Sequence, residues 1–363
     1  MASSLITAKR ELQQQLIDWF RVHARDLPWR KTRDAYRVWI SEVMLQQTQV
    51  ATVIPYYERF LQAFPTVQEL AAAPEELVLR LWEGLGYYRR ARQLQAAARC
   101  IVSEHGGQFP SDAEAVRRLP GIGRYTAGAI LSIAYDRPEP ILEANTVRLF
   151  SRLSLERGPI TAPVTRNRLW AVATELVPER DARLFNQAAM ELGSLICTPR
   201  SPRCTDCPIA QFCPTYREGL QQQIPAAAPK MVRTEVVEAA VVIRADERVL
   251  IRRCGAGERW AGLWDFPRFP VEAVEPQQLT NEIATKTKAL VGLTVKPRER
   301  LTTLRHAVTR FNITLHCFDA QLVANKKRFS LPQSEDLRWV LPSELESFPL
   351  SVTGRKISNL LRD

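Results

Sequence analysis

The chain has 363 residues, 45% of them hydrophobic and 25% charged, a globular composition long enough for two domains that excludes disorder as the default. A formal net charge of +11 and a pI near 9.5 favour a polyanionic partner such as nucleic acid. The N-terminus lacks the apolar run of a signal peptide, and no stretch approaches the roughly 18 apolar residues that span a bilayer, so we expect a cytoplasmic protein.

The pattern from Leu12 to about residue 192 is helical, and strand signals are nearly absent there. Leu12, Leu16 and Phe20, for example, share one helical face. Ser111 followed by Glu114 predicts a capping box at the start of a helix that stops at Pro120. The sequence therefore predicts an all-α first domain.

A glycine-rich turn interrupts two helical patterns in LPGIGRYTAGAILSIA, residues 119 to 134. Gly121 and Gly123 allow a tight turn that brings backbone N–H groups, at the start of the next helix, close to an anion. A plain helix connection remains the alternative. About twenty residues later Glu143 closes an apolar run where a further helix is expected to begin.

Cysteines concentrate in one short segment, CTPRSPRCTDCPIAQFC. The thiols of this segment are Cys197, Cys204, Cys207 and Cys213. In a reducing compartment this density indicates metal rather than disulfides. Four thiolates in one loop favour an iron–sulfur cluster, since zinc ribbons usually separate two CxxC pairs. Zinc and unliganded thiols remain the alternatives.

A Gln-, Ala- and Pro-rich stretch after the last of these cysteines predicts a linker over residues 216–232. β-Branched alternation then begins. We expect strands at 236–243, 248–253, 310–318 and 337–341 and an amphipathic helix at 279–293, so the second domain is α+β.

The order of these motifs resembles the helix-hairpin-helix DNA glycosylases that carry an iron–sulfur cluster. Four stretches look like the adenine DNA glycosylases of MutY type: LPWR (27–30), SEVMLQQTQV (41–50), GLGYYRRAR (84–92) and FNQAAMELGSLICTPRSPRC (185–204). The resemblance covers nearly the whole chain. It implies a multidomain protein with an all-α helix-hairpin-helix glycosylase domain over 1–215, its iron–sulfur loop at 197–213, the linker over 216–232, and a smaller α+β Nudix-like domain over 233–363.

The activity that the resemblance implies is monofunctional: excision of adenine mispaired with 8-oxoguanine or guanine, in base excision repair. A 4Fe–4S cluster is the implied cofactor. The implied partner is double-stranded DNA with a mispaired adenine, the protein is a monomer, and no membrane takes part. Two alternatives stay open: a glycosylase of the same scaffold that acts on another base, and a lesion-binding protein with weakened catalysis.

Two acidic residues correspond to the family's catalytic pair. Glu42, among apolar neighbours on a helix, matches the general acid, although an exposed helix glutamate is the alternative. Glu143 stands where the family usually has aspartate in Asp-Gly-Asn, and here the stretch is Glu143, Ala144 and Asn145. A displacement of about 1 Å can cost on the order of 100-fold in rate, so the longer arm predicts a retuned site. A helix-start carboxylate is the alternative for Glu143.

Further site residues follow from the same resemblance. Tyr125 stands where related lyases carry a Schiff-base lysine, so strand cleavage by an amine is not expected, and Tyr125 and Asn145 are expected to assist the catalytic carboxylates. Residues that match the lining of the adenine pocket are Arg25, Trp29, Arg30 and Gln187, and those that match the DNA wedge are Gln47, Thr48 and Tyr87.

The second domain departs from its relatives in two places. Its helix offers only Glu282 among lysines and threonines, so Nudix-type pyrophosphate hydrolysis is not expected. The family reads 8-oxoguanine through a Phe-Ser-His loop after a histidine. Here His306 is in place, but the loop residues are Val308, Thr309 and Arg310. Thr309 keeps a hydroxyl for the lesion, and an ordinary β-hairpin is the alternative reading.

Overall fold

The computed structural model describes residues 2–226, 232–323 and 334–362, with side chains described from residue 8 onward. The chain divides into two compact units, one formed by residues 1–72 and 92–229 and the other by residues 73–91 and 230–363. The domain boundaries expected from the sequence stay a proposal, and residues 227–231 of the expected linker lie outside the described residues. Within the described chain, no helix combines the length and the apolar character needed to span a bilayer.

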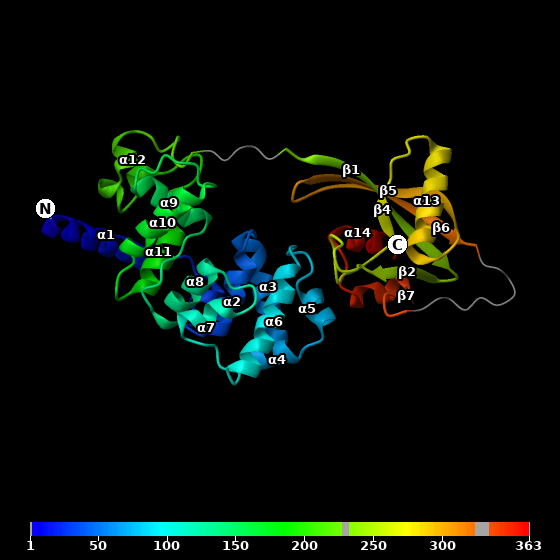
Figure 1. Cartoon of the computed structure of the whole chain (residues 1–363), viewed down its shortest axis with the longest axis horizontal. Helices are drawn as coiled ribbons and strands as arrows, with labels where there is room; N and C mark the ends of the chain where they lie inside the picture. The colour runs from blue at the N-terminus through cyan, green and yellow to red at the C-terminus, as the bar shows by residue number, and fades with distance from the viewer. Residues whose placement is uncertain (1, 227–231, 324–333, 363) are drawn as a thin grey trace. The chain divides into compact units, whose positions relative to one another are not determined.

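The described elements of the first unit are helices (Figure 1). They are α1 (Ala2–His23), η1 (Pro28–Arg30), α2 (Ala35–Leu45), α3 (Val50–Ala63), α4 (Val67–Ala72), α6 (Arg89–Glu104), α7 (Ala113–Arg118), α8 (Arg124–Tyr135), α9 (Ala144–Leu153), α10 (Pro163–Leu176), α11 (Ala182–Leu195), η2 (Cys204–Asp206), η3 (Ala210–Phe212) and α12 (Pro214–Arg217). The all-α expectation for this region is confirmed.

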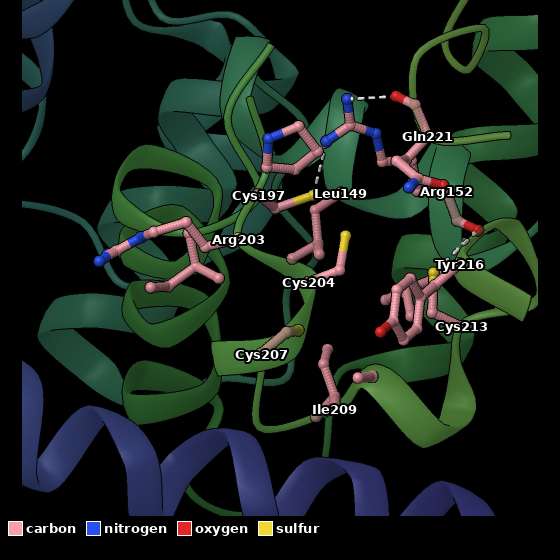
Figure 2. Close-up of a pocket in the computed structure, with 14 residues that line it drawn as sticks. Leu149, Arg152, Cys197, Arg203, Cys204, Cys207, Ile209, Cys213, Tyr216 and Gln221 are labelled. Atoms are coloured by element: carbon pink, nitrogen blue, oxygen red, sulfur yellow. Dashed lines mark hydrogen bonds between the residues drawn. The ribbon is translucent and has the colours of Figure 1, made fainter. Parts of the chain in front are cut away.

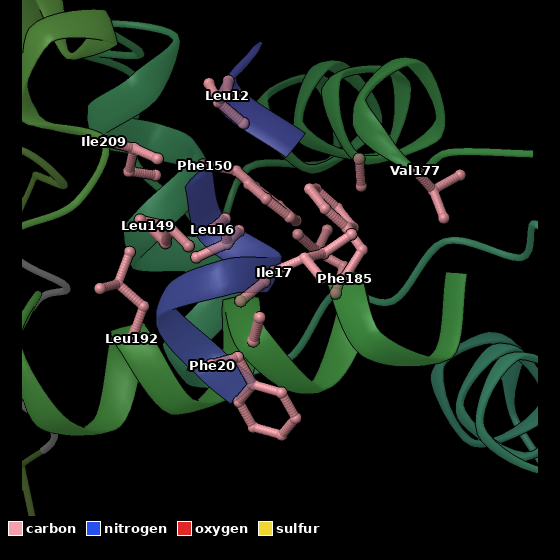
Figure 3. Packing of buried hydrophobic residues seen from close by; sticks show 14 of the residues in the cluster. Leu12, Leu16, Ile17, Phe20, Leu149, Phe150, Val177, Phe185, Leu192 and Ile209 are labelled. Atoms are coloured by element: carbon pink, nitrogen blue, oxygen red, sulfur yellow. The ribbon is translucent and has the colours of Figure 1, made fainter. Parts of the chain in front are cut away.

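The predicted apolar face of α1 forms part of a core with α9, α10 and α11 (Figure 3). Leu16 is buried in it, in the same cluster as Phe150 of α9 and Phe185 of α11. Burying a side chain of this size contributes about 1.5–3 kcal/mol. This core fixes α9 and α11, which carry residues of the site described below.

The cap of α7 differs from the prediction. Asp112 is the N-cap, and its Oδ1 accepts hydrogen bonds of 3.0 Å from the backbone N–H groups of Glu114 and Ala115. The predicted box on Ser111 is therefore wrong by one residue. Aspartate caps helices as well as serine does, and starting the helix after Asp112 lets one carboxylate satisfy two terminal amides.

The expected linker is tied to the first unit at its beginning. The buried guanidinium of Arg152 donates to the carbonyl of Gln221 at 2.8 Å and to that of Ile224 at 2.9 Å. Buried carbonyls that accept from a charged donor are held firmly, because losing the partner would leave them unsatisfied.

The second unit is built on one mixed sheet (Figure 1). Its strands are β1 (Thr234–Ala245), β2 (Arg248–Arg253), β3 (Trp264–Asp265), β4 (Arg268–Pro270), β5 (Val295–Val308), β6 (Phe311–Leu322) and β7 (Leu337–Val340). The order is β3-β2-β1-β6-β5, with β4 on β1 and β7 on β2, and β1 pairs parallel to β6. Its helical elements are α5 (Glu75–Leu81), α13 (Pro276–Val291), η4 (Pro342–Ser347) and α14 (Val352–Leu360).

Each face of the sheet carries its own apolar cluster. Ile283 of α13 packs in the cluster that contains Val241, and Ile357 of α14 packs in the cluster that contains Val242. Neighbouring residues of β1 thus point to opposite layers, as strand geometry requires. The α+β expectation is confirmed.

The expected strands and helix of this unit are present as β1, β2, β6, β7 and α13. The short strands β3 and β4 were not predicted, and neither was β5. Strand β5 is an edge strand on β6, and its burial pattern is largely exposed, since it carries arginines and lysine along its length. Edge strands often carry charge, which hides the apolar alternation that marks an interior strand.

Residues 73–91 are bound to the rest of the second unit by a partly buried ion pair. Arg355 of α14 donates to both oxygens of Glu83, at 2.7 and 3.0 Å, and the backbone N–H of Leu350 donates to Glu83 at 3.2 Å. The indole N–H of Trp264 donates to Glu76 at 2.9 Å. Bidentate Arg–carboxylate pairs fix orientation as well as distance.

Candidate active site

One pocket of about 640 Å³ in the first unit collects most of the residues singled out from the sequence. It is lined by Arg25, Trp29, Arg30, Glu42, Gln47, Thr48, Gly121, Gly123, Tyr125, Glu143, Asn145 and Gln187, together with further residues of α2, α8 and α11. Tyr87, His306 and Thr309 belong to the second unit. Sequence positions up to 169 residues apart, Arg25 and Ser194, therefore form one cavity, in which an extruded nucleotide fits by size.

Glu42 is buried on α2, with 3% of its surface exposed. The hydroxyl of Tyr125, from α8, donates to Glu42 Oε2 at 2.5 Å. Burial raises the pKa of Glu42 to about 7, against the opposing effect of the Tyr125 hydrogen bond. A carboxyl group with this pKa is in part protonated at neutral pH and can donate a proton.

Glu143 is the N-cap of α9. Its carboxylate accepts from the backbone N–H of Asn145 at 2.9 Å and from that of Thr146 at 3.0 Å, and the Thr146 hydroxyl accepts from the Glu143 N–H in return. Burial raises the pKa of Glu143, while these amide donors act in the opposite direction. The residue is thus a helix-start carboxylate and at the same time part of the pocket lining.

Arg148 connects the start of α9 with its surroundings. Its guanidinium donates to Asn145 Oδ1 at 3.0 Å, to the Gly193 carbonyl at 2.5 Å and to the Cys197 carbonyl at 2.6 Å. Gly193 on α11 approaches α9 so closely that a Cβ there would lie 2.8 Å from both the Cβ and the carbonyl oxygen of Asn145. The position of Asn145 therefore depends on α11 and on the cysteine loop.

Glu191 of α11 was missed in the sequence. It lines the pocket, is 1% exposed, and binds the side chains of both Arg25 and Arg30. A signal was present: Glu191 lies four residues after Gln187, on the same face of one helix. Burial raises the pKa of Glu191, but the hydrogen bonds from Arg30 and Arg25 outweigh it and lower the pKa to about 2.

The hairpin has the geometry of an anion site. Gly121 has φ +75°, and a Cβ there would lie 2.7 Å from Gln93 Cβ, so the turn needs glycine. Gly123 is the N-cap of α8, and no side chain among the described residues caps that end. The first amides of α8 remain as donors for an anion such as a phosphate.

Three residues predicted to contact DNA have left-handed backbones: Gln47 with φ 60°, Tyr87 with φ 48° and Thr309 with φ 47°. Residues other than glycine seldom adopt this conformation, and an aromatic or β-branched residue there is strained. The Tyr87 side chain is 50% exposed. Strain of this kind is often retained at binding sites.

His306 and Thr309 lie on the β5–β6 hairpin, where Thr309 and Arg310 form the turn between Val308 and Phe311. His306 Nδ1 is buried without a hydrogen-bond partner within the described structure, and Nε2 lies 3.5 Å from Arg268 Nη2. Burial, and then Arg268, lower the pKa of His306, which favours the neutral ring.

The carboxylate of Glu282 is engaged in local contacts rather than available as a metal ligand. Its carboxylate accepts from the backbone N–H of Ala273 at 2.9 Å and pairs with Lys286 at 2.6 Å. A carboxylate bound in this way serves the local fold.

The four cysteines line one pocket with Arg152, which donates to Cys197 Sγ at 3.2 Å (Figure 2). In the described residues no group of three or more His, Cys, Asp or Glu side chains is arranged to hold a single metal ion. Figure 2 shows the thiols around a shared space. This arrangement fits a 4Fe–4S cluster, in which each thiolate binds a different iron.

Three parts of the chain match family models. Residues 40–175 match the HhH-GPD superfamily of base excision DNA repair proteins, residues 197–213 the iron-sulfur binding domain of endonuclease III, and residues 238–360 the NUDIX domain. An adenine DNA glycosylase of Buchnera aphidicola subsp. Schizaphis graminum (strain Sg) is 38% identical over 257 residues, which are 70% of this chain and 74% of the relative. The chain belongs to the adenine DNA glycosylase family.

Another relative and a solved structure are also similar to this chain. The adenine DNA glycosylase of Rattus norvegicus is 46% identical over 223 residues, 59% of this chain and 43% of the relative, so this chain spans less than half the length of that relative. The structure of a thermostable thymine-DNA glycosylase is similar with a TM-score of 0.54 and 28% identity, over 59% of this chain and 99% of that chain.

The matches confirm the expected architecture, a helical glycosylase region followed by a Nudix-like region. They also decide between the metals considered for the cysteine loop: residues 197–213 bind an iron–sulfur cluster of the 4Fe–4S type rather than zinc. When bound, the cluster would crosslink the loop through iron–thiolate bonds, with the cationic side chains of the loop facing solvent.

Proposed function

We propose that this protein is a monofunctional DNA glycosylase that releases adenine mispaired with 8-oxoguanine or guanine in duplex DNA, and that it acts as a monomer. The observation that carries the proposal is the pair of carboxylates, Glu42 and Glu143, on one pocket of about 640 Å³. Breaking the bond between base and sugar needs a proton for the leaving base and a negative charge beside the cationic sugar.

Glu42 is the proton donor. Its pKa of about 7 keeps a substantial fraction protonated at neutral pH, and its proton goes to a ring nitrogen of adenine as the bond to the sugar breaks. Tyr125 orients the carboxyl group through the 2.5 Å hydrogen bond. Tyr125 also offers no amine, so the abasic sugar is left without strand cleavage by a Schiff base.

Glu143 stabilises the oxocarbenium-like sugar. Its two oxygens use one lone pair each for the amides of Asn145 and Thr146, which leaves further lone pairs for the substrate side. The N-terminus of α9 favours its ionised form. The side chain of Glu143 is one methylene longer than that of aspartate. The cap accommodates this length, because backbone amides hold both carboxylate oxygens.

The duplex is held and opened by residues outside the catalytic pair. The α8 N-terminus behind Gly123 binds a phosphate, and Gln47 and Thr48 of the first unit fill the gap left by the extruded nucleotide. Tyr87, which belongs to the second unit, contacts the same duplex through its exposed ring. Thr309, exposed in the β5–β6 turn, contacts the base opposite adenine.

The base is selected in the pocket. Arg25, Trp29 and Gln187 offer donors, an aromatic surface and an amide able to donate and accept. Adenine presents both a donor and acceptors at its edges, so this mixed set suits it.

The proposal is tested by single-turnover incubation with duplexes that carry adenine opposite 8-oxoguanine, guanine or thymine, followed by alkali to reveal abasic sites. Glu42→Gln should abolish base release and keep DNA binding. Glu58→Gln, an exposed glutamate on α3, is the matched control and should leave the rate unchanged.

Two results would overturn the proposal. Tight binding of these duplexes without base release would favour a lesion-binding protein. That alternative is suggested by Glu143, which stands where the family usually has aspartate. Release of a base other than adenine would favour a glycosylase of the same scaffold with a different target.

A further inference from the structure

Glu191 is the most heavily hydrogen-bonded carboxylate of the pocket lining. Its Oε1 accepts from the backbone N–H of Arg25, from Arg25 Nε and from Arg30 Nη1, each at 2.9 Å. Its Oε2 accepts from Arg25 Nη2 at 2.6 Å and from Arg30 Nη2 at 2.8 Å. One side chain of α11 thus fixes both guanidinium groups of the 25–30 turn, from 166 and 161 residues away.

These contacts leave little freedom for Arg30. Its Nη1 also donates to the Arg25 carbonyl at 3.0 Å, and its guanidinium lies 5.1 Å from the centre of the Phe20 ring. Arg25 donates in addition to the Ser194 hydroxyl at 3.3 Å. Two buried or half-buried cations held this close together need a compensating anion, because an unpaired charge in such a place is costly.

Glu42 lies on the same pocket lining as this cluster, and Arg30 is the member of the cluster that lowers its pKa. The charged or titratable groups that act on it are Tyr125 of α8, Glu143 at the start of α9 and Arg30 of η1, while α3 contributes the apolar Val50 to the lining and α11 contributes Glu191. Two guanidinium cations and one carboxylate sum to +1 at this corner of the pocket. Without Glu191 the same two cations would carry +2, with the carboxyl group of Glu42 on the same pocket lining.

We propose that Glu191 is a positioning residue of the glycosylase pocket: by neutralising one charge of the Arg25–Arg30 pair it keeps those cations from ionising Glu42, so that Glu42 stays a proton donor. The kinetic part of this inference rests on the proposed function. The electrostatic part does not, because it concerns the ionisation of one side chain in the free protein.

The sign of the effect follows from the charges. Loss of the Glu191 charge leaves more positive potential at Glu42, which favours the ionised form and lowers its pKa. We expect a fall of about one unit from the value of about 7, which is the lower end of shifts caused by one nearby charge. At about pH 7.5 the protonated fraction would fall from about a quarter to about 3%, so base release would slow by about eight-fold.

The direct experiment is a carbon-13 NMR titration of the full chain with its cluster bound and with glutamate labelled at Cδ. The Glu42 resonance is assigned by its loss in Glu42→Gln. Glu191→Gln should move the midpoint to lower pH by about one unit. Glu191→Gln combined with Arg30→Gln restores the net charge of +1 and should return the midpoint to near the original value.

A purely structural role for Glu191 predicts otherwise, since a second change in the pocket would not repair the first. Should Glu191→Gln fail to fold, Arg30→Gln alone keeps Glu191, removes one cation and should raise the midpoint. Unmoved midpoints in Glu191→Gln, or in Arg30→Gln, would overturn the inference.

The same proteins separate this inference from the proposed function. Midpoints that move as expected in a protein that releases no adenine would leave this inference standing and remove the proposed function. Adenine release whose pH dependence is the same in the original protein and in Glu191→Gln would do the reverse.

Discussion

The hydrogen bond from Tyr125 to Glu42 predicts that loss of the tyrosine hydroxyl extends base release to higher pH. The hydroxyl donates at 2.5 Å, and a donor of this kind stabilises the ionised carboxylate. In Tyr125→Phe the ionised form loses its donor while burial remains, so the pKa of Glu42 rises above about 7. The acid then keeps its proton to higher pH, and the fall in rate moves in the alkaline direction.

The size of the shift follows from the strength of the bond. A hydrogen bond to a charged group contributes about 1.5–3 kcal/mol, and one pKa unit corresponds to about 1.4 kcal/mol. The midpoint of the fall in rate should therefore rise by about one to two pH units.

The assay is single-turnover base release over about pH 6 to 9. The protein is kept sub-saturating, so that the pH dependence reports the ionisation of groups in the free protein. Tyr36→Phe is the matched control: Tyr36 lies on the same helix as Glu42 and is buried, but its hydroxyl donates to the Phe64 carbonyl at 2.7 Å. Its midpoint should not move. A midpoint in Tyr125→Phe that stays in place or falls would refute the assignment of Glu42 as the titrating acid, whatever happens to the maximal rate.

Three further changes test contacts of the fold. Glu143→Ala removes the cap of α9 and should lower the free energy of unfolding by about 1 kcal/mol, whereas Glu143→Asp keeps a capping carboxylate and should lose less. Gly193→Ala places a methyl group 2.8 Å from Asn145 and should cost about 1–3 kcal/mol. Glu83→Ala leaves the half-buried Arg355 without its carboxylate and should cost about 3 kcal/mol in the second unit.

Urea unfolding followed by circular dichroism measures all three. Equal stability of the alanine and aspartate variants at 143 would show that the cap contributes nothing. A stable alanine at 193 would mean that α9 and α11 separate without cost. For the ion pair, the control is Glu346→Ala, which removes a carboxylate that is 65% exposed, and a loss as large as that of Glu83→Ala would contradict the argument from burial.

Local patterns explain what could be predicted. The helical stretch up to residue 192, the strands of the sheet interior and the spacing of the four cysteines depend on neighbours in the chain, and each was found. The cap of α7 was misplaced by one residue because Ser111 and Asp112 are both good caps, and only the helix start decides between them. Strand β5 was missed because an edge strand shows its charges to solvent.

The sequence by itself predicted the helical first unit, the mixed second unit, the cysteine loop and the two candidate acidic residues, Glu42 and Glu143. Periodicity, spacing and motifs are local features of the chain, and these predictions depend on them. Tertiary structure alone decided that Glu42 is buried against Tyr125, that Glu143 caps α9 with both oxygens, and that Glu191 holds two arginines more than 160 residues away. The physical reason is that burial and pairing of charge depend on which distant segments meet. Those encounters set the ionisation of a carboxyl group, and no local pattern records them.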